Sequence, residues 1–140
     1  MNPAAQGWWQ FAPSPALVER LPAMMPGLRV ELLREFLRIN ATESEWNAQV
    51  ARQLGADLVS RDELERMGRS AWVWDAFFAR FPSASALVEL SQAAIDSDNG
   101  TALVYCGASS GALAGRGFLV MLQYRDGGWM PTVWQLVWES

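Results

Sequence analysis

The chain has 140 residues and a mass of 15.5 kDa, with 51% hydrophobic and 19% charged residues. That is the size of one domain, and the chain is too apolar to be disordered. Fifteen acidic against 11 basic residues give a net charge of −4, and there is no histidine. All 11 basic residues are arginine, so lysine is absent too. These absences exclude an imidazole base, a histidine-ligated metal, a Schiff-base lysine and a P-loop lysine.

The first 13 residues show neither a helical nor a strand period and predict an extended aromatic arm. Trp8, Trp9 and Phe11 stand there among proline, glycine and alanine. We expect this arm either to fold back over an apolar sheet face or to bind a partner.

We expect a cytoplasmic protein without membrane association. The N-terminus lacks the basic start and apolar run of a secretory signal, and no apolar run approaches the ~20 residues of a membrane helix. Cys106 is the one cysteine, so no intrachain disulfide can form. The composition, rich in alanine, arginine and glycine, is typical of a bacterial or phage gene of high GC content.

Residues 14–98 predict a helical part of five or six helices. Ser14 followed by Pro15 is a typical helix start, since the hydroxyl can cap and proline tolerates the first turn. We expect Pro22 to end this helix. After a turn, an apolar stripe predicts a second helix that ends at about Ile39.

Further helices are expected in the rest of this part. Two capping-box patterns, Thr42 with Glu45 and Ser60 with Glu63, each precede an apolar period. An aromatic segment, residues 71–81, and a last segment from about Ser85 to Asp96 complete the helical part.

Residues 100–140 predict a three-stranded antiparallel meander with strands at 101–106, 116–124 and 129–138. Asp126-Gly127 is a strong hairpin-turn signal. As a two-residue turn it places Tyr124 opposite Trp129. The predicted fold is therefore a single α+β domain, in which the helical part packs on this meander.

The predicted strands are apolar on both faces, so both faces need a cover. The helices can cover one face, and the other needs more chain, a ligand or another protein. Trp134, Leu136 and Trp138 fall on one strand face by alternation. The glycine-rich residues 107–117 predict a long flexible connection between the first two strands.

Few residues can carry catalysis. Residues 107–111 match the G-x-S-x-G pattern of serine hydrolases, but the chain has no histidine or lysine to act as the base. Cys106 lacks a thiolate-stabilising neighbour. The remaining acid–base candidates are carboxylates: Glu43 with Glu45, Asp62 with Glu63 and Glu65, and Asp75, which stands apart because it is set among aromatic residues. We expect no metal and no cofactor, and the balance favours a protein without catalytic activity.

The C-terminal hairpin resembles the closing hairpin of nuclear-transport-factor-2-like proteins. The similarity covers Gly117 to Trp138, with the turn Asp126-Gly127-Gly128-Trp129 leading into the last strand. In that family, helices precede a long curved antiparallel sheet. The resemblance implies a cone-shaped α+β domain.

The leading hypothesis is a non-catalytic protein-binding module of a bacterial or phage cytosol, of the inhibitor, immunity or antitoxin type. Tryptophan is enriched at binding hot spots, and acidic helix starts would match a basic partner protein. The scattered arginines argue against nucleic-acid binding. The predicted partner-binding residues are Trp8, Trp9, Phe11, Asp57, Asp62, Glu63, Glu65, Trp134 and Trp138.

Two alternatives remain open. One is a small-molecule-binding or isomerase-like domain of the cone-shaped type, with Asp75 as its acid–base group. Its pocket would be lined by Trp72, Trp74, Phe78, Tyr105, Met121 and Trp134. The other is a structural subunit or homodimer in which the sheet face pairs with itself.

Overall fold

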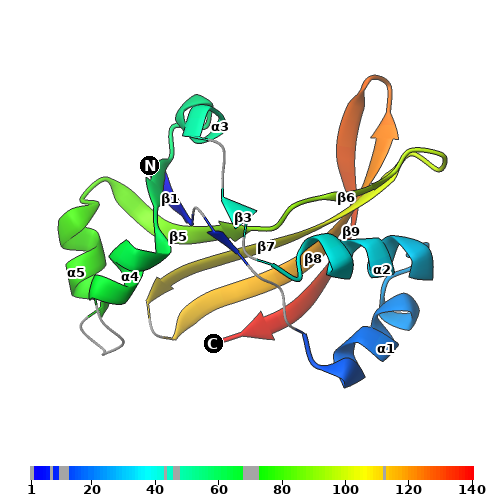
Figure 1. The fold of residues 1–140 in the computed structure, drawn as a ribbon, viewed down its shortest axis with the longest axis horizontal. Coiled ribbons are helices and arrows are strands. Elements are labelled where there is room, and N and C mark those ends of the chain that lie inside the picture. Colours follow the sequence, from blue (N-terminus) through cyan, green and yellow to red (C-terminus); the bar gives the residue numbers. More distant parts are fainter. Residues whose placement is uncertain are drawn as a thin grey trace.

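The computed structural model describes residues 2–6, 8–9, 13–42, 44–45, 48–67, 73–111 and 113–140. It shows a mixed α+β fold with five helices arranged around a twisted sheet (Figure 1). The helices among the described residues are α1 (Pro15–Met24), α2 (Val30–Ile39), α3 (Ala48–Gln53), α4 (Arg61–Met67) and α5 (Val73–Arg80). The strands are β1 (Asn2–Gln6), β2 (Trp8–Trp9), β3 (Ser44–Glu45), β4 (Asp57–Val59), β5 (Ala84–Leu90), β6 (Ala94–Asp96), β7 (Thr101–Gly111), β8 (Ala114–Arg125) and β9 (Gly128–Glu139).

The main sheet has seven strands in the order β4-β1-β5-β7-β8-β9, with β6 paired to β7. Strands β5, β7, β8 and β9 are antiparallel neighbours, whereas β1 runs parallel to both β4 and β5. The predicted meander therefore corresponds to three of the seven strands of a larger mixed sheet. The predicted N-terminal arm contributes an interior strand of that sheet, rather than a cover over one of its faces.

The prediction of a helical part over a three-stranded meander is wrong. Residues 14–98 also contribute strands, and β5 with β6 occupies the segment expected to form the last helix. Apolar spacing in this short segment fits a helix and a strand alike. Because β5 lies between β1 and β7, ladder hydrogen bonds on both sides favour the strand.

The predicted capping box at Thr42 is also wrong. Glu45 pairs with Trp8, and Ser44 pairs with Trp9, in a separate two-stranded ladder of β2 and β3. Helix α3 begins only at Ala48. The backbone of this segment is held by a partner far away in the sequence, which no local pattern indicates.

Helices α1 and α2 build the main core against β6, β7 and β8. The predicted cap at Ser14 is confirmed, since its Oγ accepts a hydrogen bond from the Leu17 N–H at 3.2 Å. Pro22 does not end α1 but lies in its last turn, close enough to the end that little helix follows it. The buried residues of this core are Leu21, Met25, Leu28, Leu32, Leu33, Phe36, Ala94, Leu103, Tyr105, Leu119 and Met121.

The side chain of Asn40 joins the end of α2 to the segment before β6. Its Nδ2 donates to the carbonyls of Phe36, at 3.0 Å, and Gln92, at 3.1 Å. Its Oδ1 accepts from the Gln92 N–H at 3.0 Å. The amide is fully buried, and these bonds satisfy both donors and the acceptor, so its burial costs little.

A second, smaller core lies under α4 and α5. Val59, Phe77 and Phe81 are buried there, with the rings of Phe77 and Phe81 5.3 Å apart. The capping box at Ser60 is confirmed in part, because its Oγ accepts from the Glu63 N–H at 3.1 Å. The aromatic segment forms α5 as predicted, but α5 packs on this second core and not on the main one.

The β8–β9 hairpin has the predicted turn, and two bulges shift its register farther along β9. Asp126 and Gly127 both have positive φ, 51° and 82°, which is typical of the turn that matches strand twist. Tyr124 faces Trp129 as predicted. A bulge at Thr132 then adds a residue to β9, and a second bulge at Val137 adds another.

The glycine-rich segment 107–117 forms the paired ends of β7 and β8, not the flexible connection predicted from its composition. Its glycines leave room for two large side chains on the helix side of the sheet. A Cβ at Gly107 would lie 2.6 Å from the Tyr105 hydroxyl, and a Cβ at Gly117 would overlap the Trp138 indole. Packing therefore explains these two glycines.

Replacing Gly117 by alanine should destabilise the fold by about 2 kcal/mol, because the new methyl group overpacks against Trp138. The control is Gly128→Ala in β9, where nothing lies within 4 Å of a new Cβ. That change should be neutral or slightly stabilising. Urea unfolding of both variants measures the difference, and equal stability of the two would contradict the packing account.

Candidate functional site

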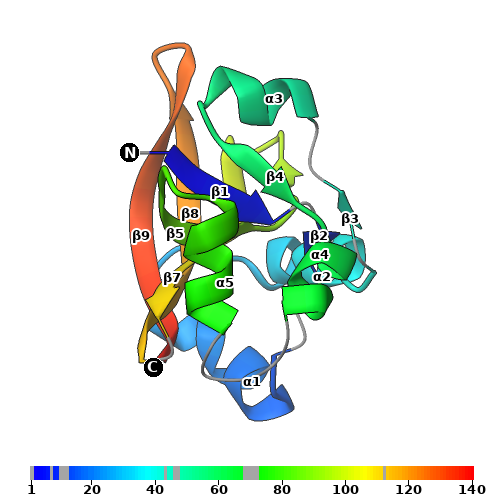
Figure 2. The same ribbon diagram turned by 90° about the vertical axis from the view of Figure 1, so that its left-hand side faces the viewer.

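The helices cover only one face of strands β7, β8 and β9. In Figure 2, β9 lies at the left-hand side of the molecule, with β8 and β7 beside it, and the helices lie to the right of β9. Leu103, Tyr105, Leu119 and Met121 point into the main core. The residues that alternate with them therefore point away from the helices.

We call this second side of the sheet the open face. It is almost wholly apolar. Phe118, Trp134 and Leu136 lie on it together, since Leu136 pairs with Phe118 and Trp134 pairs with the neighbouring Val120. The apolar residues of the open face are Ile95, Ala102, Val104, Cys106, Phe118, Val120, Leu122, Tyr124, Trp129, Pro131, Trp134 and Leu136, of which Ala102 and Val120 are buried. Arg116 and Glu139 lie on the same side of the sheet.

Large aromatic side chains on the open face are strongly exposed. Trp134 is 60% exposed, Tyr124 52% and Trp129 41%. Near the hairpin turn, Tyr124 and Trp129 pack edge to face with their ring centroids 5.3 Å apart. In the middle of the strands, the ring centroids of Phe118 and Trp134 are 6.3 Å apart. With Leu136, 40% exposed, they present on the order of 400 Å² of apolar surface. Patches of this size on a single chain often mark interaction sites.

A shallow groove of about 590 Å³ lies at the end of the open face away from the β8–β9 turn. Its apolar walls come from Cys106, Phe118 and Trp134. At its edge Arg116 Nε lies 2.8 Å from Glu139 Oε1. Its remaining lining residues are Ala108, Leu113, Ala114, Gly115 and Ser140.

The two predicted C-terminal tryptophans lie on opposite faces of the sheet. Trp134 lies on the open face, but the bulge at Val137 reverses the alternation before Trp138. Trp138 therefore packs against the main core. Its Nε1–H donates to the Tyr105 hydroxyl at 2.6 Å, and that hydroxyl donates to Glu89 Oε2 at 3.3 Å. Burial raises the pKa of Tyr105, so this chain of hydrogen bonds holds a neutral phenol.

The other predicted binding residues lie elsewhere. Asp57 lies on β4, while Asp62, Glu63 and Glu65 lie on α4, and Glu63 is paired with Arg80 at 2.9 Å. The structure does not bring this acidic group together with Trp134. Trp8 and Trp9 form β2, and Phe11 lies outside the described residues.

The pocket of the small-molecule alternative does not assemble. Trp74 and Phe78 pack on the second core, Tyr105 and Met121 are buried in the main core, and Trp134 lies on the open face. Trp72 lies outside the described residues. Asp75 is exposed on α5 and is not enclosed by these aromatic side chains.

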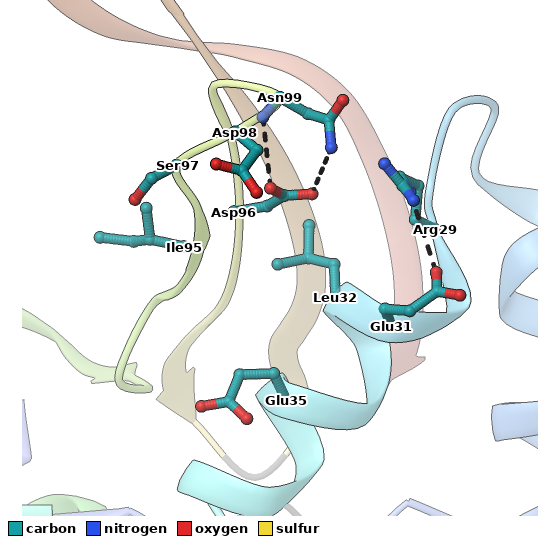
Figure 3. Close-up of a pocket in the computed structure, with 9 residues that line it drawn as sticks. All are labelled: Arg29, Glu31, Leu32, Glu35, Ile95, Asp96, Ser97, Asp98 and Asn99. Carbon is teal, nitrogen blue, oxygen red and sulfur yellow. Dashed lines mark hydrogen bonds and ion pairs between the residues drawn. The ribbon is translucent and has the colours of Figure 1, made fainter.

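A second recess, of about 390 Å³, opens between the start of α2 and the turn after β6 (Figure 3). It is acidic, but its groups are engaged locally. Asp96 accepts from the Asn99 side chain at 2.8 Å, which lowers the pKa of the carboxyl, and Arg38 does the same for Glu35 at 2.6 Å. The recess is completed by Arg29, Glu31, Leu32, Ile95, Ser97 and Asp98.

Among the described ranges of the chain, no cluster of three or more acidic or cysteine side chains could hold a metal ion. None of the helices in those ranges has the length and apolar character needed to cross a membrane. No family model matches the chain, and neither a curated protein nor a solved structure is significantly similar to it. The site is therefore defined by geometry alone.

Cys106 lies on the open face and is the one cysteine of the chain, so its reaction with a thiol reagent probes that face alone. Burial raises the pKa of its thiol, and the thiolate is the reactive form. The rate of iodoacetamide alkylation should therefore keep rising with pH after the rate for the urea-unfolded chain has levelled off. Identical pH profiles for the folded and unfolded chains would contradict this environment for Cys106.

Proposed function

We propose that this protein is a non-catalytic protein-binding module whose contact surface is the open face. The observation that carries the proposal is the exposure of Trp134, Tyr124 and Trp129 on an apolar sheet face that the helices leave uncovered. Side chains of this kind bury much area at a small cost in conformational entropy. A protein surface is the occupant that can bury a face of this extent.

Catalysis has little support on this face. Cys106 is the nucleophile present, and the raised pKa of its thiol keeps it protonated at neutral pH. Arg116 and Glu139 neutralise each other at the edge of the groove. The chain has no histidine or lysine to serve as a base. The groove can hold an apolar group but offers no acid–base pair to transform it.

The charge of the open face also indicates which kind of partner protein can bind there. The leading hypothesis predicted a basic partner, recognised through the acidic residues of α4. The open face carries no uncompensated acid, so a partner that docks there is apolar at its centre. An inhibitor, immunity or antitoxin role in a bacterial or phage cytosol is a narrower form of this proposal and stays a prediction from the sequence.

The proposal is tested by placing a photo-crosslinking amino acid at position 134 of the full chain in cells that produce it. We expect a covalent protein–protein product after illumination, because the side chain at this position projects from the open face.

The matched control is position 54, since Leu54 is 63% exposed but lies after α3, outside the open face. A product at position 134 and none at position 54 supports the proposal. Absence of a product at position 134, or equal amounts of product at both positions, would contradict the proposed function.

A further inference from the structure

We infer that the occupant of the open face is a second copy of this chain, packed face to face about a two-fold axis. This inference rests on the proposed function, and it names the partner. Three features carry it: the charge balance of the face, the positions of its groove and its aromatic pair, and the protection of the neighbouring sheet edge.

The charge balance of the open face removes the main obstacle to self-association. The chain carries a net charge of −4, so two copies repel each other wherever their acidic surfaces meet. Two charged residues of strands β7, β8 and β9 lie on the open side, Arg116 and Glu139, and they form an ion pair with each other. Face-to-face packing thus joins two neutral surfaces and keeps the acids of β4, α4 and α5 outside.

The open face has complementary ends. Tyr124 and Trp129 pack edge to face at the end beside the β8–β9 turn, and the groove extends from Phe118 and Trp134, in the middle of the strands, to the other end. Figure 1 shows these ends of β8 and β9 far apart, one at the turn and one near the C-terminus.

Consider a two-fold axis that lies between the two open faces and runs across the strands at their middle. This axis turns one copy end for end relative to the other, so that the strands of the two copies run in opposite directions. It therefore sets the Tyr124–Trp129 pair of each copy over the groove of its partner. One symmetric arrangement fills both grooves and buries both aromatic pairs. A sheet pair packed in this way has the usual layered form of a sandwich core.

Pairing through the edge of β9 is the competing way to join two copies, and the sequence of β9 opposes it. Pro131 removes a backbone donor from this edge strand. The bulges at Thr132 and Val137 interrupt the regular spacing of the remaining groups. Prolines and bulges are the usual devices by which an edge strand avoids pairing with another chain. Beside β9, the face and not the edge strand is therefore left to associate.

Sedimentation equilibrium of the purified full chain tests the inference. We expect a species with twice the 15.5 kDa chain mass, and Trp134→Arg should raise the dimer dissociation constant roughly 30-fold or more, the loss typical of a hot-spot residue. Leu54→Arg, at an equally exposed apolar residue outside the face, should leave the dimer intact.

Circular dichroism shows whether Trp134→Arg keeps the fold. If it does not, Tyr124→Arg replaces it, because Tyr124 is 52% exposed at the far end of the same face. In the folded monomeric variant, Cys106 should also react faster with a thiol reagent than in the wild-type dimer, since the partner copy no longer covers it.

The outcomes separate this inference from the proposed function. A wild-type monomer that crosslinks from position 134 to a different protein overturns the second copy and leaves the binding module standing. A monomer that gives no product from position 134 overturns both. A dimer that Trp134→Arg and Tyr124→Arg leave unchanged uses another surface, and the inference is wrong.

Discussion

The arrangement of this protein depends on one constraint: a sheet that is apolar on both faces has helices on only one of them. Leu119 and Met121 are buried under α1 and α2, while their neighbours Val120 and Leu122 point the other way. The main core is complete without any contribution from the open face. Burial of apolar surface stabilises the fold on the helix side of the sheet, whereas Trp134, Tyr124 and Trp129 on the other side keep much of their apolar surface in water.

Two bulges in β9 decide which aromatic residues belong to the core and which to the open face. Without the bulge at Val137, Trp138 would share a face with Trp134 and could not reach the Tyr105 hydroxyl. Gly115 and Gly117 of β8 make room for that indole, so the segment with the simplest composition has a tightly specified role. The same strand thereby supplies both a core anchor and an exposed anchor.

Local signals predicted part of this fold. The turn at Asp126-Gly127, the cap at Ser14 and the need to cover a second apolar face all follow from neighbouring residues. The parallel β1 strand, the strand at β5 and the β2–β3 ladder depend on partners far along the chain, which composition and period do not report. For the candidate site, the sequence pattern singles out Trp134 as a contact residue, whereas Phe118, Tyr124 and Trp129 join it only through the register and exposure that the structure supplies.

The most direct measurement is hydroxyl-radical footprinting of the wild-type protein over a wide range of concentrations. We expect Trp134 to be readily oxidised in dilute solution and to become protected as the concentration rises, while the modification of Trp138 stays constant. Protection of Trp134 at every concentration would show that the chain itself covers the open face. Oxidation of Trp134 at every concentration would show that no second copy does.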